Sequence, residues 1–257
     1  EFERTKHVHR LHPYLGKFIP QLVDVFLRKY FKNGDTILDP FSGSGTTLVE
    51  ANVLSMNSIG IELSPFNVLI QKVKTQKYDI PKVEKEIKDA LGRLKTFSKH
   101  LTAGGQTLLF NEGIRRFETD SEYLKKWFSD RALQEILFYR HIIKDYENQD
   151  ILEIILSRSA RSARLIPHYD LARPQKPVRE TYWCIKHKRY CEPINEALKF
   201  INRYSWDTIR RLKEFDRLRT DAFMKIFQGD ARIIKLPSDL KIDGIFTSPP
   251  YVGVIDY

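Results

Sequence analysis

Apolar side chains recur along the chain at two different spacings, and the change of spacing separates predicted strands from predicted helices. Short apolar runs that end at a turn or an acid are typical of buried strands. Such runs lie at 36–38, 58–61, 225–227 and 242–247. The segment from Pro20 to Phe31 and the segment after Ser64 repeat their apolar residues at helical spacing instead. This alternation predicts an α/β fold with a doubly wound, Rossmann-like sheet.

The long middle of the chain keeps the helical spacing from Pro81 to about Thr220. We interpret this region as a mainly helical insertion between the second and third strands. The chain then has three parts: 1–80 with the first two strands, 81–220 as the insertion, and 221–257 as the continuation of the sheet. Residues 4–12 are basic and rich in histidine, so we expect an arm. Because the histidines have no metal-ligand spacing, we expect them to be exposed or to cap a helix and not to bind a metal.

Composition narrows the class of protein. The 257 residues carry a formal net charge of +10, and no apolar run is long enough to span a membrane. Two cysteines do not suggest a disulfide scaffold, and no signal peptide is visible, so we expect a cytoplasmic protein. Residues 151–220 hold 16 Lys and Arg against 8 Asp and Glu. This excess of basic residues can be interpreted as a solvated helical surface. The alternative interpretation is a face that contacts a polyanion such as nucleic acid.

The first strand runs into Asp39-Pro40-Phe41-Ser42-Gly43-Ser44-Gly45-Thr46-Thr47, a strand–glycine loop–helix junction. Glycines allow a tight turn against which a ligand can lie, and the helix start offers free N–H groups. No Gly-Lys-Ser/Thr follows, and the third glycine of a dinucleotide fingerprint is missing. Asp39 suggests a cationic ligand. Glu62 ends the next strand, 17 residues after Gly45. An acid at this place can accept hydrogen bonds from the ribose hydroxyls of a nucleoside. S-adenosylmethionine, an adenosine with a sulfonium, fits this combination.

The last predicted strand runs into Ser248-Pro249-Pro250-Tyr251. Two prolines fix the backbone and remove two N–H donors, which leaves carbonyl and hydroxyl oxygens as acceptors beside an aromatic ring. Such a site suits a flat ring that carries an amine.

These motifs together resemble the DNA amino-methyltransferases. Gly229-Asp230-Ala231 is similar to the family motif beside the cofactor adenine, and Lys17-Phe18-Ile19-Pro20 to the motif over the methionine end. The resemblance implies that a methyl group passes from S-adenosylmethionine to the exocyclic amine of a base flipped out of double-stranded DNA, as in restriction-modification systems. It implies catalytic roles for Ser248, Pro249, Pro250 and Tyr251. The implied cofactor-binding residues are Phe18, Pro20, Asp39, Pro40, Phe41, Ser42, Gly43, Gly45, Thr46, Thr47, Glu62, Leu63, Asp230 and Ala231.

The motifs do not determine which amine accepts the methyl group. Ser248 at the first motif position resembles the enzymes that methylate the 4-amino group of cytosine more than those that methylate the 6-amino group of adenine. The alternatives are an adenine enzyme, an RNA or tRNA amino-methyltransferase, and a DNA-binding subunit that is catalytically incomplete.

Two features lie inside the insertion. Arg158, Arg161 and Arg164 recur every third residue and would share a broad helical face, a candidate for phosphate contact or a solvated surface. Cys184, His187 and Cys191 could hold zinc with one further ligand, of which His168 is a candidate. The sequence favours ordinary packed or free thiols at these positions, so we assign no metal from the sequence.

The chain ends six residues after Tyr251, whereas the resembled fold has further strands after that motif. We therefore expect a strand at 242–247 with one side unpaired, next to an exposed apolar surface at Ile245 and Val254. A complementing polypeptide or self-association would cover it.

Overall fold

The computed structural model describes residues 6–13, 18–102, 116–168 and 174–249. These residues fall into two compact units. Unit 1 comprises 1–80 and 210–257, and unit 2 comprises 81–209. Unit 2 thus starts where the insertion was predicted to start and closes eleven residues before Thr220, at a boundary that falls within a helix.

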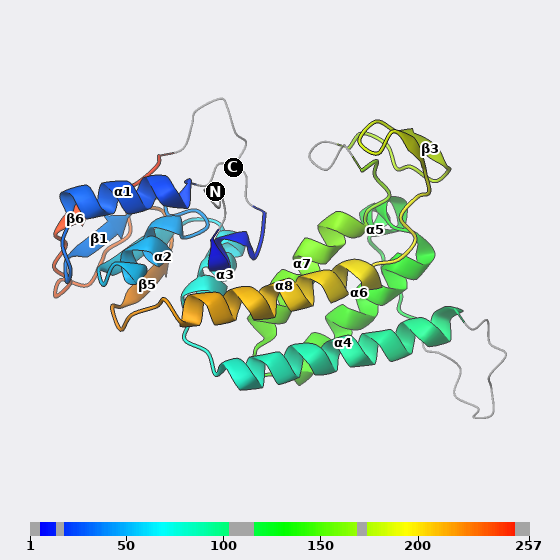
Figure 1. Cartoon of the computed structure of the whole chain (residues 1–257), viewed down its shortest axis with the longest axis horizontal. Helices are drawn as coiled ribbons and strands as arrows, with labels where there is room; N and C mark the ends of the chain where they lie inside the picture. The colour runs from blue at the N-terminus through cyan, green and yellow to red at the C-terminus, as the bar shows by residue number, and fades with distance from the viewer. Residues whose placement is uncertain (1–5, 14–17, 103–115, 169–173, 250–257) are drawn as a thin grey trace. The chain divides into compact units, whose positions relative to one another are not determined.

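Unit 1 is built on a parallel sheet, as the sequence predicted (Figure 1). Its strands are β1 (Thr36–Asp39), β2 (Asn57–Glu62), β5 (Met224–Gln228) and β6 (Gly244–Ile245). They lie in the order β5-β2-β1-β6, with β1 and β2 in the centre. β6 is shorter than the predicted run at 242–247 and forms the edge of the described sheet, where Ile245 is 62% exposed. Val254 lies outside the described residues.

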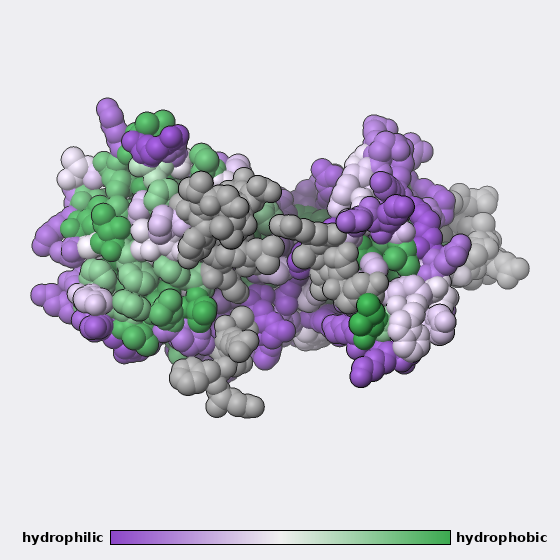
Figure 2. All heavy atoms as spheres, turned by 90° about the horizontal axis from the view of Figure 1, so that it is seen from above, coloured by the Kyte–Doolittle hydropathy of each residue, from purple (hydrophilic) through white to green (hydrophobic). Residues whose placement is uncertain are grey.

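Three helices accompany this sheet: α1 (Pro20–Tyr30), α2 (Thr46–Val53) and α3 (Pro65–Thr75). Val23 and Leu27 of α1, Ile37 of β1 and Ala51 of α2 share one buried core. The helical spacing in α1 puts Val23 and Leu27 on the buried side of the helix. It leaves other apolar side chains on the opposite side, where Val25 is 60% exposed. Figure 2 shows hydrophobic side chains gathered on the face of unit 1 that carries α1.

The N-terminal histidines do not form the arm that the sequence suggested. His7, His9 and His12 are buried, and the first two belong to the short 3-10 helix η1 (His7–Arg10). A His9 ring nitrogen lies 2.7 Å from a carboxylate oxygen of buried Glu50, and the Lys6 ammonium donates to the other oxygen at 2.8 Å. Burial and the neighbouring His9 lower the pKa of His7 to about 3, so this ring is neutral at pH 7. The prediction was wrong because a local pattern of basic residues does not reveal a distant acid such as Glu50.

Unit 2 is mainly helical (Figure 1). Its elements are α4 (Ile80–Thr102), α5 (Glu122–Trp127), α6 (Asp130–Ile142), the 3-10 helix η2 (Ile143–Asp145), α7 (Gln149–Ala163) and α8 (Leu198–Asp216). Apolar stripes on these helices supply the core, which includes Leu94, Tyr139 and Ile155. The insertion also contains an antiparallel hairpin that was not predicted, β3 (Tyr182–Cys184) and β4 (Arg189–Cys191).

One buried acid organises the centre of unit 2. Glu135 is fully buried, and one of its oxygens accepts hydrogen bonds from the N–H groups of Ala197 and Leu198 at 2.6 and 2.8 Å. The other oxygen accepts from the Ser98 hydroxyl and from Arg131. The carboxylate therefore caps the start of α8, where free N–H groups and the helix dipole favour a negative charge. In the described part of the chain, no helix is long and apolar enough to cross a bilayer.

Candidate functional site

The predicted motif ends meet at one edge of the sheet in unit 1. Parallel strands present their carboxyl ends at the same edge, and ligands of such sheets bind there. A pocket of about 330 Å³ lies at this edge. It is lined by Phe18, Asp39, Pro40, Phe41, Ser42, Gly43, Ser44, Thr46, Thr47, Ile61, Glu62, Leu63, Gly229, Asp230, Ala231, Arg232 and Ser248. All four sequence motifs contribute, so this pocket is the candidate functional site.

The glycine loop owes its shape to two residues with positive φ. Gly43 has φ of +51° and Gly45 has φ of +76°, a left-handed conformation that residues with a Cβ rarely adopt. The loop is then tied to β2, because both the N–H and the hydroxyl of Ser42 donate to the Ile61 carbonyl, at 3.0 and 2.9 Å. Gly60 allows this close approach, since a Cβ there would lie 2.8 Å from the Ser42 hydroxyl oxygen.

Helix α3 supports the same loop from its buried side. Gln71 donates to the Gly43 carbonyl at 2.8 Å, and the buried Lys74 donates to the Ser44 carbonyl at 2.5 Å. These two residues hold the loop without lining the pocket. The sequence indicates Gln71 and Lys74 only as polar residues within the apolar stripe of α3. This indication is weak, because polar residues at such positions are often solvated.

Asp39 is the acid at the end of β1, and it is only 2% exposed. Its carboxylate accepts a hydrogen bond from the Thr247 hydroxyl at 2.7 Å and one from the Phe41 N–H at 3.2 Å. Burial raises the pKa of the Asp39 carboxyl above its usual range, and the hydrogen bond from Thr247 opposes this shift. A buried acid of this kind is stabilised by a positive charge brought into the pocket.

Glu62 ends β2 and presents its carboxylate at the same edge. One carboxylate oxygen accepts from the Ser64 N–H at 2.8 Å, which orients the group, and the Glu62 carbonyl accepts from Gly229 N–H of the neighbouring β5 end. Next to it, Leu63 is 68% exposed, and Phe41 across the loop is also exposed. The pocket therefore combines an oriented acid with two apolar side chains that a ring can contact.

Asp230 lies in the loop after β5, and its carboxylate is already paired. Arg232 holds both of its oxygens, with the shorter nitrogen–oxygen distance at 2.6 Å. Hydrogen bonding to Arg232 lowers the pKa of Asp230 to about 2. A ligand group that bonds to this carboxylate would have to share it with the guanidinium or displace it.

The catalytic motif reaches the pocket through Ser248, which is half-buried and lines it. The residues before it position the motif: Thr247 is bonded to Asp39, and Phe246 stacks on Phe18 with ring centroids 5.4 Å apart. Pro249 is exposed and does not line the pocket. Pro250 and Tyr251 lie outside the described residues.

Two of the predicted cofactor residues do not line the pocket. Pro20 is the buried first residue of α1, and Gly45 is the N-cap of α2, where a Cβ would lie 3.0 Å from Gln71. Four further lining residues were not among the predicted cofactor-binding residues, although Ser44 and Gly229 belong to the predicted motifs: Ser44, Ile61, Gly229 and Arg232. All four adjoin predicted positions along the chain, and Arg232 directly follows Ala231.

The three arginines of unit 2 do not share one environment. Arg158 is buried, donates to Asp207 at 2.7 Å and lies 4.0 Å from the centroid of the Tyr204 ring. Arg161 is half-buried on α7, and Arg164 follows the last helical residue, so it is not part of the helix. The common solvated face that the spacing suggested is therefore not formed by Arg158.

Comparisons with known proteins find a family model and three curated relatives. A family described as DNA methylase matches residues 2–73. The chain is 40% identical to the Type II methyltransferase M.MjaII of Methanocaldococcus jannaschii, in a match that covers all of this chain and 61% of the relative. It is 23% identical to the Type II methyltransferase M.MvaI of Kocuria varians, over 95% of this chain and 53% of that protein. It is 25% identical to the Type II methyltransferase M.BsoBI of Geobacillus stearothermophilus, over 99% of this chain and 51% of that protein. No solved structure matches the chain significantly.

The chain thus spans between about half and three fifths of the length of the relatives it matches.

Proposed function

We propose that this chain is a DNA amino-methyltransferase and that its pocket binds S-adenosylmethionine for methyl transfer to the exocyclic amine of a DNA base; the match to the DNA methylase family and the likeness to the Type II methyltransferase M.MjaII support this. The observation that carries this proposal is the convergence of the glycine loop, Glu62, Asp230 and Ser248 on one pocket. A volume of about 330 Å³ lies within the usual range for small-molecule sites.

The residues of the pocket fit the parts of this cofactor. Glu62 is oriented by the Ser64 N–H and can accept hydrogen bonds from two neighbouring ribose hydroxyls. Phe41 and Leu63 offer exposed apolar surface to the adenine faces. Asp39 supplies a buried carboxylate with a raised pKa, which a positive charge on the ligand would stabilise. The cofactor would supply an activated methyl group on its sulfonium.

The chemistry asked of the protein is mostly positioning. The amine of a nucleobase is a poor nucleophile because its lone pair is delocalised into the ring. Acceptors at the Ser248 hydroxyl and the Pro249 carbonyl would bond the amine hydrogens and localise that lone pair. The hydrogen bond from Thr247 to Asp39 ties this motif to the glycine loop. It therefore fixes the position of the hydrogen-bond acceptors of the motif relative to the pocket.

We propose the 4-amino group of cytosine as the acceptor, because the motif begins with Ser248. The 6-amino group of adenine is the alternative within the family. In either case the base lies inside a duplex until it is flipped out, and Tyr251 is proposed to stack on it.

Double-stranded DNA is the proposed partner, and its phosphates are proposed to contact the basic part of unit 2. Arg161 and Arg164 stay in this proposal, whereas Arg158 is engaged with Asp207 and is expected to serve packing. A complementing polypeptide on the β6 side also stays a prediction.

Binding of the cofactor is tested by calorimetry with S-adenosylmethionine on the purified 257-residue chain. Glu62→Ala should weaken binding about tenfold or more, since each lost ribose hydrogen bond to a charged group contributes roughly 1.5–3 kcal/mol. Asp221→Ala, an exposed acid of the same unit, is the control. Unchanged affinity in Glu62→Ala would reject the pocket assignment.

Methyl transfer is tested with radiolabelled cofactor on unmethylated duplex DNA and on tRNA. Nucleoside analysis of the DNA should yield N4-methylcytosine, and N6-methyladenine would redirect the proposal to adenine. Label in tRNA alone would indicate an RNA enzyme. Cofactor binding without transfer to either substrate would support the incomplete-subunit alternative, and transfer restored by a second polypeptide would identify that polypeptide as the proposed partner.

A further inference from the structure

The hairpin of unit 2 brings three sulfur and nitrogen ligands together within eight residues. Cys184 ends β3 and Cys191 ends β4, so the two thiols lie at opposite ends of the paired strands. The turn between them places Lys188 at φ of +51°, and the Lys188 N–H donates to the Cys184 carbonyl at 2.7 Å. This tight turn folds His187 back over the hairpin, where its Nδ1 lies 3.6 Å from the Cys184 sulfur and 3.4 Å from the Cys191 sulfur.

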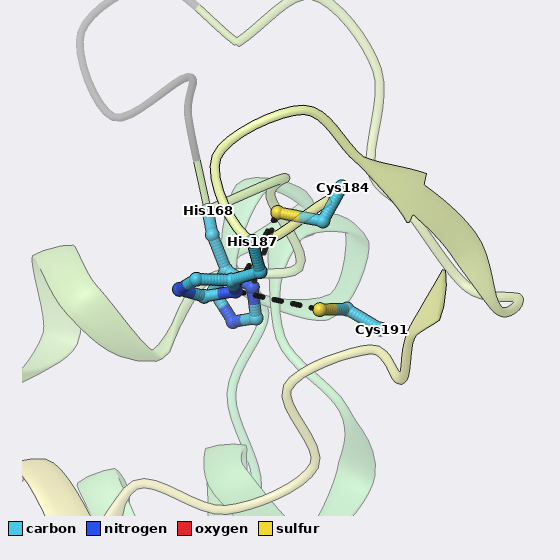
Figure 3. A group of neighbouring side chains, drawn as sticks. All are labelled: His168, Cys184, His187 and Cys191. Atoms are coloured by element: carbon cyan, nitrogen blue, oxygen red, sulfur yellow. Dashed lines mark hydrogen bonds between the residues drawn. The ribbon is translucent and has the colours of Figure 1, made fainter. Parts of the chain in front are cut away.

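A fourth ligand comes from outside the hairpin. His168 follows α7 in the sequence, and its N–H donates to the hydroxyl of Tyr182 on β3 at 3.0 Å. This bond holds the segment against the hairpin, so that the His168 ring points toward the other three side chains (Figure 3). Its Nδ1 lies 3.9 Å from the Cys184 sulfur.

The separations are those of a tetrahedral metal site. Zinc binds sulfur at about 2.3 Å and nitrogen at about 2.0–2.1 Å, so sulfur and nitrogen ligands on one tetrahedral ion lie about 3.6 Å apart. The three measured sulfur–nitrogen distances run from 3.4 to 3.9 Å, and all four ligand atoms lie within 4.8 Å of one another. An ion at the centre would need only small adjustments of the side chains.

The ligand types select zinc. Two thiols and two imidazoles form the set typical of structural zinc sites, whereas calcium and magnesium require oxygen ligands. Both cysteines are buried, at 0% and 6% exposure, so the sulfurs are shielded from solvent. Four protein ligands leave no position for water or substrate, which indicates a structural role.

We propose that His168, Cys184, His187 and Cys191 bind one zinc ion, which fastens the β3–β4 hairpin to the segment that follows α7. The hairpin needs such a link, because two strands of three residues form a marginal structure by themselves. Its outward aromatic residues do not supply a core, since Trp183 is 53% exposed and Tyr190 is 71% exposed.

A second group of candidate ligands, in unit 1, makes a useful contrast. His7, His9 and Glu50 are also close together, but the Lys6 ammonium lies 2.8 Å from the Glu50 carboxylate. The Glu50 carboxylate is therefore already paired with a cation, the Lys6 ammonium. In addition, this group offers only three ligands among the described residues. Buried hydrogen bonding accounts for this group without a metal.

The test begins with the zinc content of the full 257-residue chain, purified without a metal-affinity tag or added metal and measured by elemental analysis. We expect close to one zinc ion per chain. Cobalt exchanged for the zinc should show the strong visible absorption of tetrahedral cobalt bound to thiolates. Chelation should increase amide hydrogen exchange in residues 182–191.

His187→Ala is the first variant, because His187 is exposed and its loss leaves no cavity in the core. Zinc affinity should fall by more than about tenfold, since even residues that only support metal ligands have effects of this size. His168→Ala should do the same, and Cys184→Ser should abolish the thiolate absorption of the cobalt form. His100→Ala, an exposed histidine of unit 2 outside the cluster, is the matched control.

Two results would overturn the proposal. One is a chain that holds no metal as purified and takes up no zinc after full reduction, with both thiols freely titratable. The other is bound zinc that stays unchanged in His187→Ala and His168→Ala, which would place the ion elsewhere.

Discussion

Asp39 in unit 1 and Glu135 in unit 2 are both buried carboxylates, yet their surroundings differ. Glu135 is met by four donors: the Ser98 hydroxyl, Arg131 and two N–H groups at the start of α8. Asp39 accepts from the Thr247 hydroxyl and the Phe41 N–H, the Thr47 hydroxyl also favours its charged form, and the acid lies at the wall of a pocket. Its pKa is raised because burial costs the charged form more than these bonds return.

The difference separates acids that hold the fold from acids that are ready for a ligand. When a buried charge has all its partners in place, removal of one partner strongly destabilises the protein. A buried charge with few partners costs stability as it stands, and a ligand of opposite charge recovers that cost. The comparison can be tested by changing each acid and measuring both stability and binding.

The largest effect is expected from Glu135→Gln. An amide cannot accept from two N–H groups, a hydroxyl and a guanidinium together, so part of the network is left unpaired. The free energy of unfolding should fall by about 3–5 kcal/mol. Denaturant titration measures it, with Glu153→Gln, an exposed acid of α7, as the control. A loss below 1 kcal/mol would show that the network is not structural.

Asp39→Asn should show the opposite pattern. Removal of a poorly compensated buried charge should leave the stability at pH 7 unchanged or slightly higher. Binding of S-adenosylmethionine should weaken by about 10- to 100-fold, from the loss of a charged partner contributing roughly 1.5–3 kcal/mol. Calorimetry and thermal unfolding on the same preparation give both values. If stability drops as far as in Glu135→Gln, the two acids are alike and the comparison fails.

The raised pKa of Asp39 predicts how affinity changes with pH. The carboxyl is neutral below this pKa and must lose its proton to face a cation. Affinity for S-adenosylmethionine should therefore rise with pH, by at most about tenfold per unit, and level off above the pKa of Asp39. S-adenosylhomocysteine lacks the sulfonium charge and should show a flatter profile. Equal slopes for both ligands, or a slope that persists in Asp39→Asn, would contradict the role of Asp39.

The smallest effect concerns an exposed pair at the rim of the same pocket. Arg232→Ala frees the Asp230 carboxylate, whose pKa should rise from about 2 toward its ordinary value. Cofactor affinity should increase by no more than about threefold, since exposed ion pairs contribute little. Lys241→Ala, which breaks the pair with Asp243, serves as the control. A large loss of affinity would instead place Arg232 on the ligand.

Much of the pocket could be predicted from local sequence. Asp39 and Glu62 end their strands, and Asp230 and Ser248 follow the ends of β5 and β6 by two and three residues. Because parallel strands put those ends at one edge, their order along the chain was enough to bring them together. The pairing of Asp230 with Arg232 could not be foreseen, because side-chain conformation decides it.

Unit 2 shows where local sequence is insufficient. The spacing of Arg158, Arg161 and Arg164 suggested one face, but Asp207 and Tyr204 of α8 take up Arg158. The Cys and His residues suggested packed thiols, because two cysteines alone do not define a zinc site. The tight turn at Lys188 and the bond from His168 to Tyr182 are what bring four ligand atoms within 4.8 Å.

The amino-acid sequence by itself determined the strands of the parallel sheet, the glycine loop and the edge of that sheet at which the motifs meet. These depend on hydrophobic spacing, on residues with special backbone freedom and on the geometry common to all parallel sheets. Only the tertiary structure decided which buried acids are satisfied, which histidines are enclosed and which ligands converge in the hairpin. Those outcomes depend on contacts between residues far apart in the chain, and no local pattern specifies the partner.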